Sequence, residues 1–320
     1  MSADMDRTKF ARGRKIADPG AASRTNRMPK RAKREMRFRD LVEPALEAKR
    51  LRGNEPSSLA TDRWRLRRVL PVIGHLKIRQ LTSGRLERFL QGLARGDALH
   101  DPVKGATVNR FHSLLGSIFR YAVRQGFAEV NPLAGGSVER SKESPIIPRY
   151  LGRDEQRRLL AAIRLECPKK ALEVELAILS GMRRGEQFNA KWEDWKPAEG
   201  ILHVHGKTGD RAVQINQAAR RCLLRLRKRA APDALFITPE RNESPRDSRL
   251  WFERAVKKAD LRPAFRFHDL RHTFCSRLVA AGVPLLEVQQ LAGHRSFQTT
   301  LRYAHLSPGH LKRAVEKVEF

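Results

Sequence analysis

The sequence lacks the long apolar segments of membrane or exported proteins. No apolar run reaches the 18 or more residues that a membrane-spanning helix needs, and the N-terminus has no apolar stretch typical of a signal peptide. The three cysteines, Cys167, Cys222 and Cys275, are odd in number and lack C-x-x-C spacing, which argues against a disulfide framework or a zinc finger. We therefore expect a cytoplasmic protein with no membrane partner.

Acidic residues are scarce relative to basic ones. The chain has 65 Lys and Arg against 35 Asp and Glu, a formal net charge of +30 and an isoelectric point near 11.2. Such a surplus favours a polyanionic partner, because self-repulsion otherwise opposes the compact state. Nucleic acid is the first candidate, and an anionic membrane surface is the second.

The length of 320 residues allows two domains. Residues 1–35 hold eleven Lys and Arg and four acids with no apolar period, which predicts a flexible basic arm. Residues 36–132 have apolar positions at helical spacing throughout, including an expected long helix at 106–124 and another capped by Ser83. We predict an all-helical domain there, followed by a Gly-, Ser- and Pro-rich linker at 133–149.

Residues 150–320 predict a mainly helical α+β domain with one small antiparallel sheet. A strand-like stretch at 201–205 meets a turn at Thr208-Gly209-Asp210 and returns at 212–215, the pattern of a hairpin. Helices are expected on both sides of this hairpin, at 153–165, 170–180, 217–229, 248–260, 268–281 and 284–291.

Several residues of this second domain are candidates for chemistry, although each also has an ordinary structural explanation. Arg183 follows an apolar helix that breaks at a glycine, and in a chain this basic it could be a solvated surface arginine. His268 and Arg271 are three apart, which places both on one face of a helix. His294 could cap a turn, and Tyr303 could be a half-buried residue of an amphipathic helix.

Two other interpretations fit these residues poorly. Gly206-Lys207-Thr208 is reminiscent of a nucleotide-binding P-loop, but that motif needs a glycine where Ile201 stands. His268 and His272 have the spacing of a helical metal pair. A zinc protease, however, would have Glu where Asp269 stands, and no third ligand follows at a suitable spacing.

Taken together, the candidates predict metal-free phosphoryl transfer. Two arginines, a lysine and two histidines precede a tyrosine, so cations can neutralise phosphate oxygens while an imidazole handles a proton and a side-chain oxygen attacks. Their order and spacing resemble the signature boxes of the tyrosine recombinases, the integrase and Xer group. The boxes are Gly181-Met182-Arg183-Arg184-Gly185-Glu186, His268-Asp269-Leu270-Arg271-His272-Thr273-Phe274, and Leu291-Ala292-Gly293-His294 with Thr299-Thr300-Leu301-Arg302-Tyr303-Ala304-His305.

This resemblance is strong over about residues 151–306, and the helical domain is similar to the family's core-type DNA-binding domain in position, size and pattern. It implies a site-specific recombinase that clamps double-stranded DNA and cleaves and rejoins it through a 3′-phosphotyrosyl intermediate. It implies a homotetramer on DNA and no need for ATP, a metal or another cofactor.

The resemblance also implies a role for each site residue. Arg183 and Arg271 would hold the non-bridging oxygens of the scissile phosphate, His294 would add a hydrogen bond, and Glu186 would support Arg183. Tyr303 would be the nucleophile. The two proton-transfer roles would fall to Lys207, which would protonate the departing 5′ oxygen, and His268, which would take the tyrosine proton.

Two departures and two rival functions accompany this interpretation. Ser180 stands where the family often has Thr, and the segment before Phe38 is too short for a full arm-binding domain. A non-catalytic DNA-binding protein would have no need of both Tyr303 and Lys207. A type IB topoisomerase uses similar chemistry, but the spacing from His268 to Tyr303 and the small size favour recombination.

The last residues predict a short amphipathic helix, because Leu311, Ala314, Val315 and Val318 recur at helical spacing. Such a short helix needs a partner surface. It could pack on its own domain or, as the resemblance implies, dock on a neighbouring subunit in a ring of four.

Overall fold

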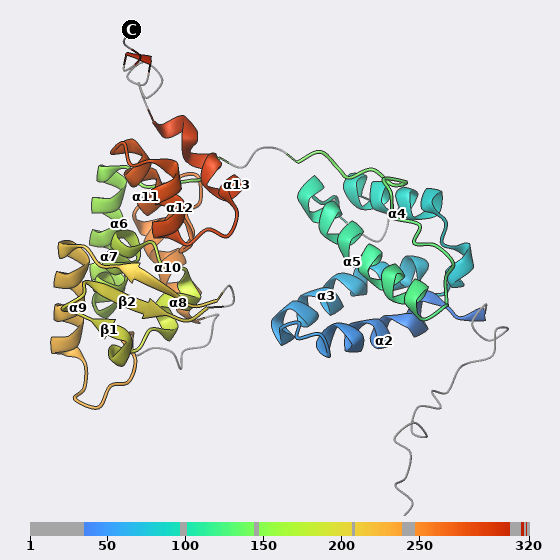
Figure 1. The fold of residues 1–320 in the computed structure, drawn as a ribbon, viewed down its shortest axis with the longest axis horizontal. Coiled ribbons are helices and arrows are strands. Elements are labelled where there is room, and N and C mark those ends of the chain that lie inside the picture. The colour runs from blue at the N-terminus through green and yellow to red at the C-terminus, as the bar shows by residue number, and fades with distance from the viewer. Residues whose placement is uncertain are drawn as a thin grey trace, which may run out of the picture. The chain divides into compact units, whose positions relative to one another are not determined.

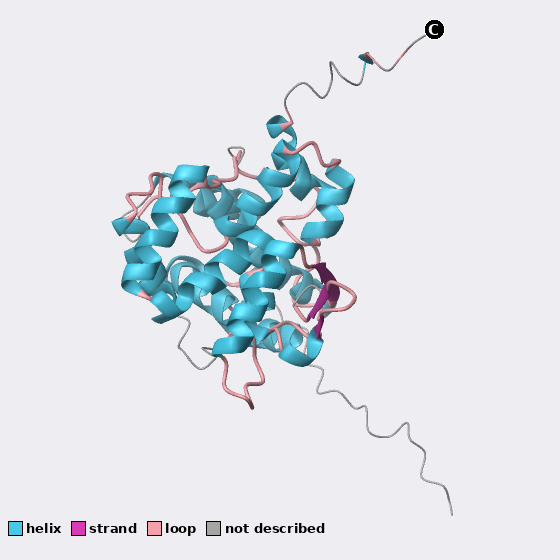
Figure 2. Ribbon diagram, turned by 90° about the vertical axis from the view of Figure 1, so that its left-hand side faces the viewer, coloured by secondary structure: helices cyan, strands magenta, loops and turns pink. Residues whose placement is uncertain are grey.

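The computed structural model describes residues 35–96, 101–143, 147–206, 209–238 and 247–307, together with 315, 316 and 318. The chain divides into two compact units, Met1–Ser144 and Pro145–Phe320. Helix predominates, and Figure 2 shows the strands confined to one small sheet. Nearly all of the predicted basic arm and of the predicted C-terminal helix lies outside the described residues.

The first unit is helical, as predicted (Figure 1). The long helix α5 packs on α2 and α4 through a fully buried stripe at four-residue spacing: Phe111, Leu115 and Phe119. The helices are α2 (Phe38–Arg50), α3 (Pro56–Ile73), α4 (Ser83–Arg95) and α5 (Gly105–Arg124), with a 3₁₀ turn at Ile78–Gln80.

One predicted cap is wrong by a residue. Thr82, not Ser83, is the N-cap of α4, since the Thr82 hydroxyl accepts the N–H of Arg85. Ser83 is the first helical residue, and its hydroxyl donates to the Pro132 carbonyl at 2.8 Å. Both residues have a hydroxyl that suits a cap, so composition alone does not separate them.

The packed part of the first unit continues into the segment that was predicted to be a linker. Leu133 and Val138 are buried in the core of this unit. The Asn109 side chain binds the backbone N–H and C=O of Ser141, each at 2.9 Å. Side chain to backbone bonds therefore hold this segment, and they leave no apolar period in the sequence.

The second unit has the predicted α+β architecture, and the predicted helices and hairpin form close to their expected bounds. The hairpin pairs Leu202 with Val213 and His203 with Ala212. A third strand, β1, pairs with the free edge of the first hairpin strand, where Trp195 lies opposite Leu202. The sequence analysis missed β1, because two residues are too few to show strand alternation.

The elements of this unit follow in chain order (Figure 1). They are α6 (Arg153–Glu166), α7 (Ala171–Ser180), α8 (Arg184–Asn189), β1 (Trp195–Lys196), β2 (Ile201–Val204), β3 (Arg211–Gln214), α9 (Gln217–Arg229), α10 (Asp247–Lys258), α11 (Asp269–Ala280), α12 (Leu285–Ala292), α13 (Phe297–Thr300) and the 3₁₀ helix η6 (Leu301–Leu306).

Helix α7 is the centre of the second unit, because it contacts α6, α9 and α11. It ends at Gly181, which has a left-handed φ of +62°. A Cβ at this position would lie 2.2 Å from the Phe274 ring, so both the conformation and the space require glycine. Among the described helices, none is long and apolar enough to cross a membrane.

Candidate active site

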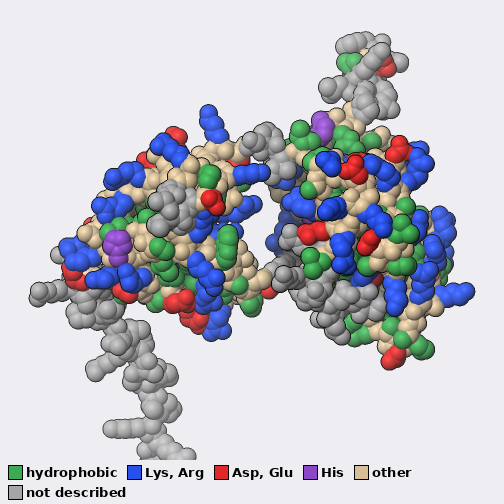
Figure 3. Space-filling view, turned by 180° about the vertical axis from the view of Figure 1, so that it is seen from behind, with side chains coloured by type: hydrophobic (Ala, Val, Ile, Leu, Met, Phe, Trp, Pro, Cys, Tyr) green, Lys and Arg blue, Asp and Glu red, His purple; other side chains and the backbone are tan. Residues whose placement is uncertain are grey.

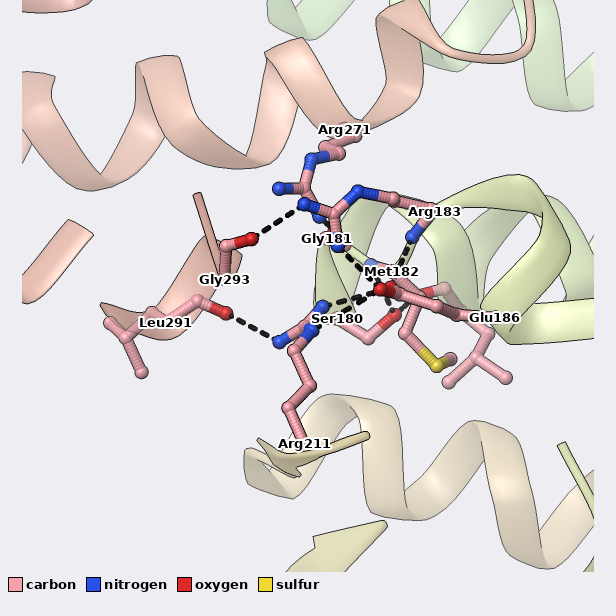
Figure 4. Close-up of polar contacts among 10 residues, drawn as sticks. Ser180, Gly181, Met182, Arg183, Glu186, Arg211, Arg271, Leu291 and Gly293 are labelled. Carbon is pink, nitrogen blue, oxygen red and sulfur yellow. Dashed lines mark hydrogen bonds and ion pairs between the residues drawn. The ribbon is translucent and has the colours of Figure 1, made fainter. Parts of the chain in front are cut away.

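Glu186 joins two arginines that come from different elements (Figure 4). It lies in the first turn of α8, where one oxygen accepts the backbone N–H of Arg183 at 2.7 Å and the other accepts Arg183 Nη1 at 2.5 Å. Arg211, the first residue of β3, donates through Nη2 to the same carboxylate at 3.0 Å. Since Glu186 is only 2% exposed, this carboxylate is buried between two guanidinium groups.

The charge of Glu186 is stabilised by these contacts. Burial alone would raise the pKa of this carboxyl, but hydrogen bonds from Arg211 and Arg183 outweigh burial and lower the pKa. Glu186 therefore stays ionised at neutral pH and compensates part of the positive charge around it.

The same two arginines also bind the end of α12. Arg183 Nη2 donates to the Gly293 carbonyl at 2.5 Å, and Arg211 Nη1 donates to the Leu291 carbonyl at 3.1 Å. Carbonyls at a helix C-terminus lack intrahelical partners, so they are natural acceptors. Gly293 has a φ of +68°, and a Cβ there would lie 2.6 Å from the Arg211 side chain. The loop that carries His294 is thus fixed against the arginines.

Arg271 is the most buried of the three arginines, with 3% of its surface exposed. It lies in the first turn of α11, and its Nη1 donates to the Gly181 carbonyl at 2.8 Å. Its Nη2 is buried and has no hydrogen-bond partner among the described residues. Burial and the nearby Arg183 lower the pKa of Arg271 to about 10, so it is charged at neutral pH. A buried, unpaired guanidinium nitrogen beside a second arginine is suited to an anion.

The aromatic part of the site surrounds Tyr303 on η6. The Tyr303 side chain is 1% exposed, and its hydroxyl is hydrogen-bonded to Nδ1 of His272. The His268 ring meets the His272 ring edge to face, with centroids 5.0 Å apart. The His294 ring lies parallel to the tyrosine ring at 6.3 Å, and its Nδ1 is 2.9 Å from the Thr300 hydroxyl.

Burial keeps these aromatic groups neutral. It lowers the pKa of His272 to about 4 and that of His294 to about 3, with further lowering by His268 and Arg271 respectively, and it also lowers the pKa of His268. Burial raises the pKa of Tyr303, and the adjacent Cys275 thiol adds to this shift. At neutral pH the tyrosine therefore keeps its proton, and the imidazoles are uncharged.

Comparison with known proteins places this site in a family. The model of the phage integrase family matches residues 149–310, and the model of the phage integrase central domain matches residues 38–136. This chain belongs to the phage integrase family. It is a tyrosine recombinase that acts on DNA, as the signature residues predicted.

Individual relatives of this recombinase agree with the family assignment. A tyrosine recombinase of Thermosipho africanus is 26% identical over 84% of this chain and 95% of its own length. Tyrosine recombinase XerC of Thermodesulfovibrio yellowstonii is 31% identical over 66% of this chain and 75% of its own.

Solved structures confirm the fold of this recombinase. A lambda integrase dimer bound to a COC′ core site superimposes with a TM-score of 0.67 at 22% identity, covering 82% of this chain and 97% of that one. The integrase of transposon Tn1549, bound to circular intermediate DNA, gives 0.69 at 20% identity, covering 88% and 100%.

The fold of the recombinase brings most of the predicted site residues together. Arg183, Glu186, Arg271, His268, His294 and Tyr303 are linked by the contacts described above. Lys207 lies outside the described residues. His272, and not His268, contacts the Tyr303 hydroxyl, because His272 lies one turn further along α11, which packs on η6.

Sequence reasoning missed two residues of this site. His272 was weighed as part of a metal pair and stands in a signature box, but it was given no role in the reaction. Its four-residue spacing from His268 was the signal that placed it on the same face. Among the described residues, no group of three or more His, Cys, Asp or Glu side chains is arranged to hold a metal ion. Arg211 had no such signal, since its partner Glu186 is 25 residues away in the sequence.

Proposed function

We propose that Tyr303 is the nucleophile of this recombinase and that Arg183 and Arg271 bind the scissile phosphate. The observation that carries the proposal is the buried, unpaired Nη2 of Arg271 beside Arg183, in a cluster that also includes the tyrosine. Two guanidinium groups match the two non-bridging oxygens of a phosphodiester. His294 supplies a further hydrogen bond to the same phosphate.

The reaction exchanges one phosphodiester for another. The Tyr303 oxygen forms a bond to phosphorus, and the bond from phosphorus to the 5′ oxygen of the DNA breaks. Lys207 gives a proton to the departing 5′ oxygen, a role that rests on the family resemblance. Because the new 3′-phosphotyrosyl bond is of the same type as the old one, a 5′ hydroxyl can reverse the step without ATP.

The tyrosine needs a base and a change of position. At 1% exposure its hydroxyl cannot meet a phosphate while it is bound to His272, so we take this contact to be the resting position. The neutral His268, whose ring adjoins His272, is the proposed acceptor of the phenol proton in the DNA-bound state.

The proposed assembly is a homotetramer on paired DNA sites in the cytoplasm. It is supported by the solved lambda integrase tetramer bound to a Holliday junction, which this chain resembles with a TM-score of 0.70 at 20% identity. The helical unit would bind the core DNA site together with the catalytic unit. A tetramer on paired sites allows strands to be exchanged between two duplexes. Neither a purely DNA-binding role nor DNA relaxation of the type IB kind needs that exchange.

The test uses covalent adducts. Sequencing the protein–DNA junctions that the wild-type chain forms on genomic DNA gives a cleavage site, from which a nicked suicide substrate is built. Tyr303→Phe should bind this substrate and form no adduct, whereas the matched Tyr150→Phe, at a partly exposed tyrosine, should form it fully. A wild-type adduct with a free 5′ hydroxyl, which a polynucleotide kinase labels directly, supports 3′ attachment. Adduct formation by Tyr303→Phe would overturn the proposal.

A further inference from the structure

Helix α9 has a dense basic surface that the catalytic cluster does not use. Six of its 13 residues are Lys or Arg, and none is acidic. All six are exposed: Arg220, Arg221, Arg225, Arg227, Lys228 and Arg229. Among the described residues, no carboxylate forms an ion pair with any of these six side chains, so the surface keeps its full positive charge.

The helix is firmly held, so the positions from which its cations extend are fixed. The Asn216 side chain caps it by accepting the N–H of Ala219 at 2.8 Å. Its opposite face is buried through Ala219, Cys222, Leu223 and Leu226, and the helix packs on α7. The Arg227 guanidinium lies 5.1 Å above the Trp192 ring. The exposed face therefore presents a row of cations on a fixed backbone.

This row is unfavourable for the isolated helix. Like charges four residues apart, such as Arg221 with Arg225 and Arg225 with Arg229, repel one another along a helix face. Cations in the last turn are favoured by the helix dipole, but Arg220 and Arg221 lie near the N-terminal end, where the dipole is positive. An anionic ligand along the helix would offset these repulsions.

The basic face of α9 is remote from the tyrosine. Figure 1 places α9 and α13, the helix that precedes η6, at opposite edges of the second unit. Figure 3 shows Lys and Arg side chains gathered along the edge on which α9 lies. A duplex that is seated on Arg183 and Arg271 therefore leaves this face of the unit free.

We propose that the exposed face of α9 is a second DNA-binding surface, which holds the phosphates of a duplex segment other than the one at Arg183 and Arg271. Thirteen residues make a helix of about 20 Å, and duplex DNA has one charge per about 1.7 Å, so roughly twelve phosphate charges lie along its length. The only large apolar side chain exposed on α9 is Leu224, which gives a protein or membrane partner little to anchor on. Contacts of this kind are independent of DNA sequence.

The test compares two triple variants that remove the same charge. Arg221→Gln, Arg225→Gln and Lys228→Gln together neutralise α9, and Arg153→Gln, Arg158→Gln and Lys169→Gln together neutralise exposed positions on α6 and the turn after it. Circular dichroism melting first checks that both fold. Binding to a 30-bp duplex of arbitrary sequence is then measured between about 50 and 200 mM salt.

We expect the α9 triple to lower the slope of log K against log salt by about 2.7, because each lost phosphate contact contributes about 0.9. The α9 triple, when bound to a duplex on beads, should also fail to recruit a second, fluorescent duplex. The control triple should recruit that second duplex as well as the wild type does. Adduct formation on the suicide substrate should stay within about twofold of the wild type, which is under 0.5 kcal/mol.

Three outcomes would overturn the proposal. Equal slopes and equal recruitment in both triples would mean that the exposed face of α9 contacts only solvent and does not bind DNA. Loss of adduct formation by the α9 triple would place α9 on the duplex that is cut. Weakened binding to polyglutamate with unchanged DNA binding would indicate an acidic protein partner. None of these results bears on the proposed role of Tyr303, because Tyr303→Phe tests that role separately.

Discussion

Burial leaves the two halves of the active site in different charge states. In one half, burial lowers the pKa of Arg271 only to about 10, so the guanidinium keeps its charge at neutral pH. In the other half, burial lowers the pKa of His272 to about 4 and that of His294 to about 3, so both rings are neutral. One physical effect thus leaves the arginine charged and the histidines neutral, because the two side-chain types start from very different pKa values.

The two halves also differ in what holds them together. The arginine half relies on a charged partner, Glu186, and on carbonyls at the ends of α7 and α12. The histidine half relies on ring contacts and on single hydrogen bonds, such as the one between His294 and Thr300. Changes in the first half should therefore act through charge, and changes in the second through proton transfer and packing.

The largest effect is expected for Arg271→Ala. Removing a guanidinium that stabilises phosphoryl-transfer charge costs about 10³–10⁵ in rate, so single-turnover adduct formation should fall by that range. Arg271→Lys should recover little of it, because an ammonium cannot bind the Gly181 carbonyl and a phosphate with the same fork geometry. A loss of less than about tenfold for Arg271→Ala, or 1.4 kcal/mol, would remove Arg271 from the phosphate site.

A smaller loss is expected in the histidine half, where two adjacent rings can be compared directly. If His268 is the base, His268→Gln should slow adduct formation by about 10²–10⁴, the usual range for a positioned proton acceptor. His272→Gln should cost less, because it frees the tyrosine from its resting contact without removing that base. The check is a pair of pH–rate profiles. A larger loss for His272→Gln, together with loss of the acidic limb, which reports deprotonation of the base, would transfer the role of base to His272.

Glu186→Gln tests the arginine half without changing its shape. It leaves the partly buried guanidinium groups of Arg183 and Arg211 without their counter-charge, and removing one partner of a buried pair costs up to about 3–5 kcal/mol of unfolding free energy. Glu199→Gln, at an exposed position, is the control and should cost almost nothing. Urea unfolding measures both, and a saturating short duplex should restore part of the Glu186→Gln loss. Equal stability of the two variants would mean that the arginines do not need this carboxylate.

The contrast between the two halves was only partly predictable from sequence. Arg183, His268, Arg271, His294 and Tyr303 could be singled out from the sequence because the predicted phosphoryl transfer requires fixed residue types in a fixed order, and the structure places them near one another. No sequence pattern indicates the ion pair between Arg211 and Glu186, because an arginine that begins a strand beside a turn is usually exposed to solvent.

Other features depend on packing that no local pattern reveals. The sequence indicated a half-buried Tyr303 on an amphipathic helix, whereas the structure has it fully buried on a 3₁₀ helix against His272. The neutral state of the histidines likewise follows from burial in the folded chain. Strand β1 is too short to show a period. Local propensity placed the elements, and tertiary contacts decided the state of the site.

The smallest expected effect is a loss of stability in mild acid that comes from the histidine half. The folded pKa values of His272 and His294 lie below the unfolded value of 6.5, so the unfolded chain binds more protons between them. Stability is therefore complete above about pH 6.5 and falls as the pH drops toward 4. Because both rings are partly exposed, solvent screening limits the effect near pH 5.5 to about 1 kcal/mol or less per ring.

Urea unfolding at pH 7.5 and 5.5 measures this loss of stability. His294→Asn removes one titrating ring, so it should flatten the pH dependence even if it lowers stability at pH 7.5. His203→Asn, at an exposed strand position, should keep the wild-type dependence. If His294→Asn and His203→Asn lose the same stability on acidification, burial does not hold His294 in its neutral form. The difference in charge state between the two halves then has no support.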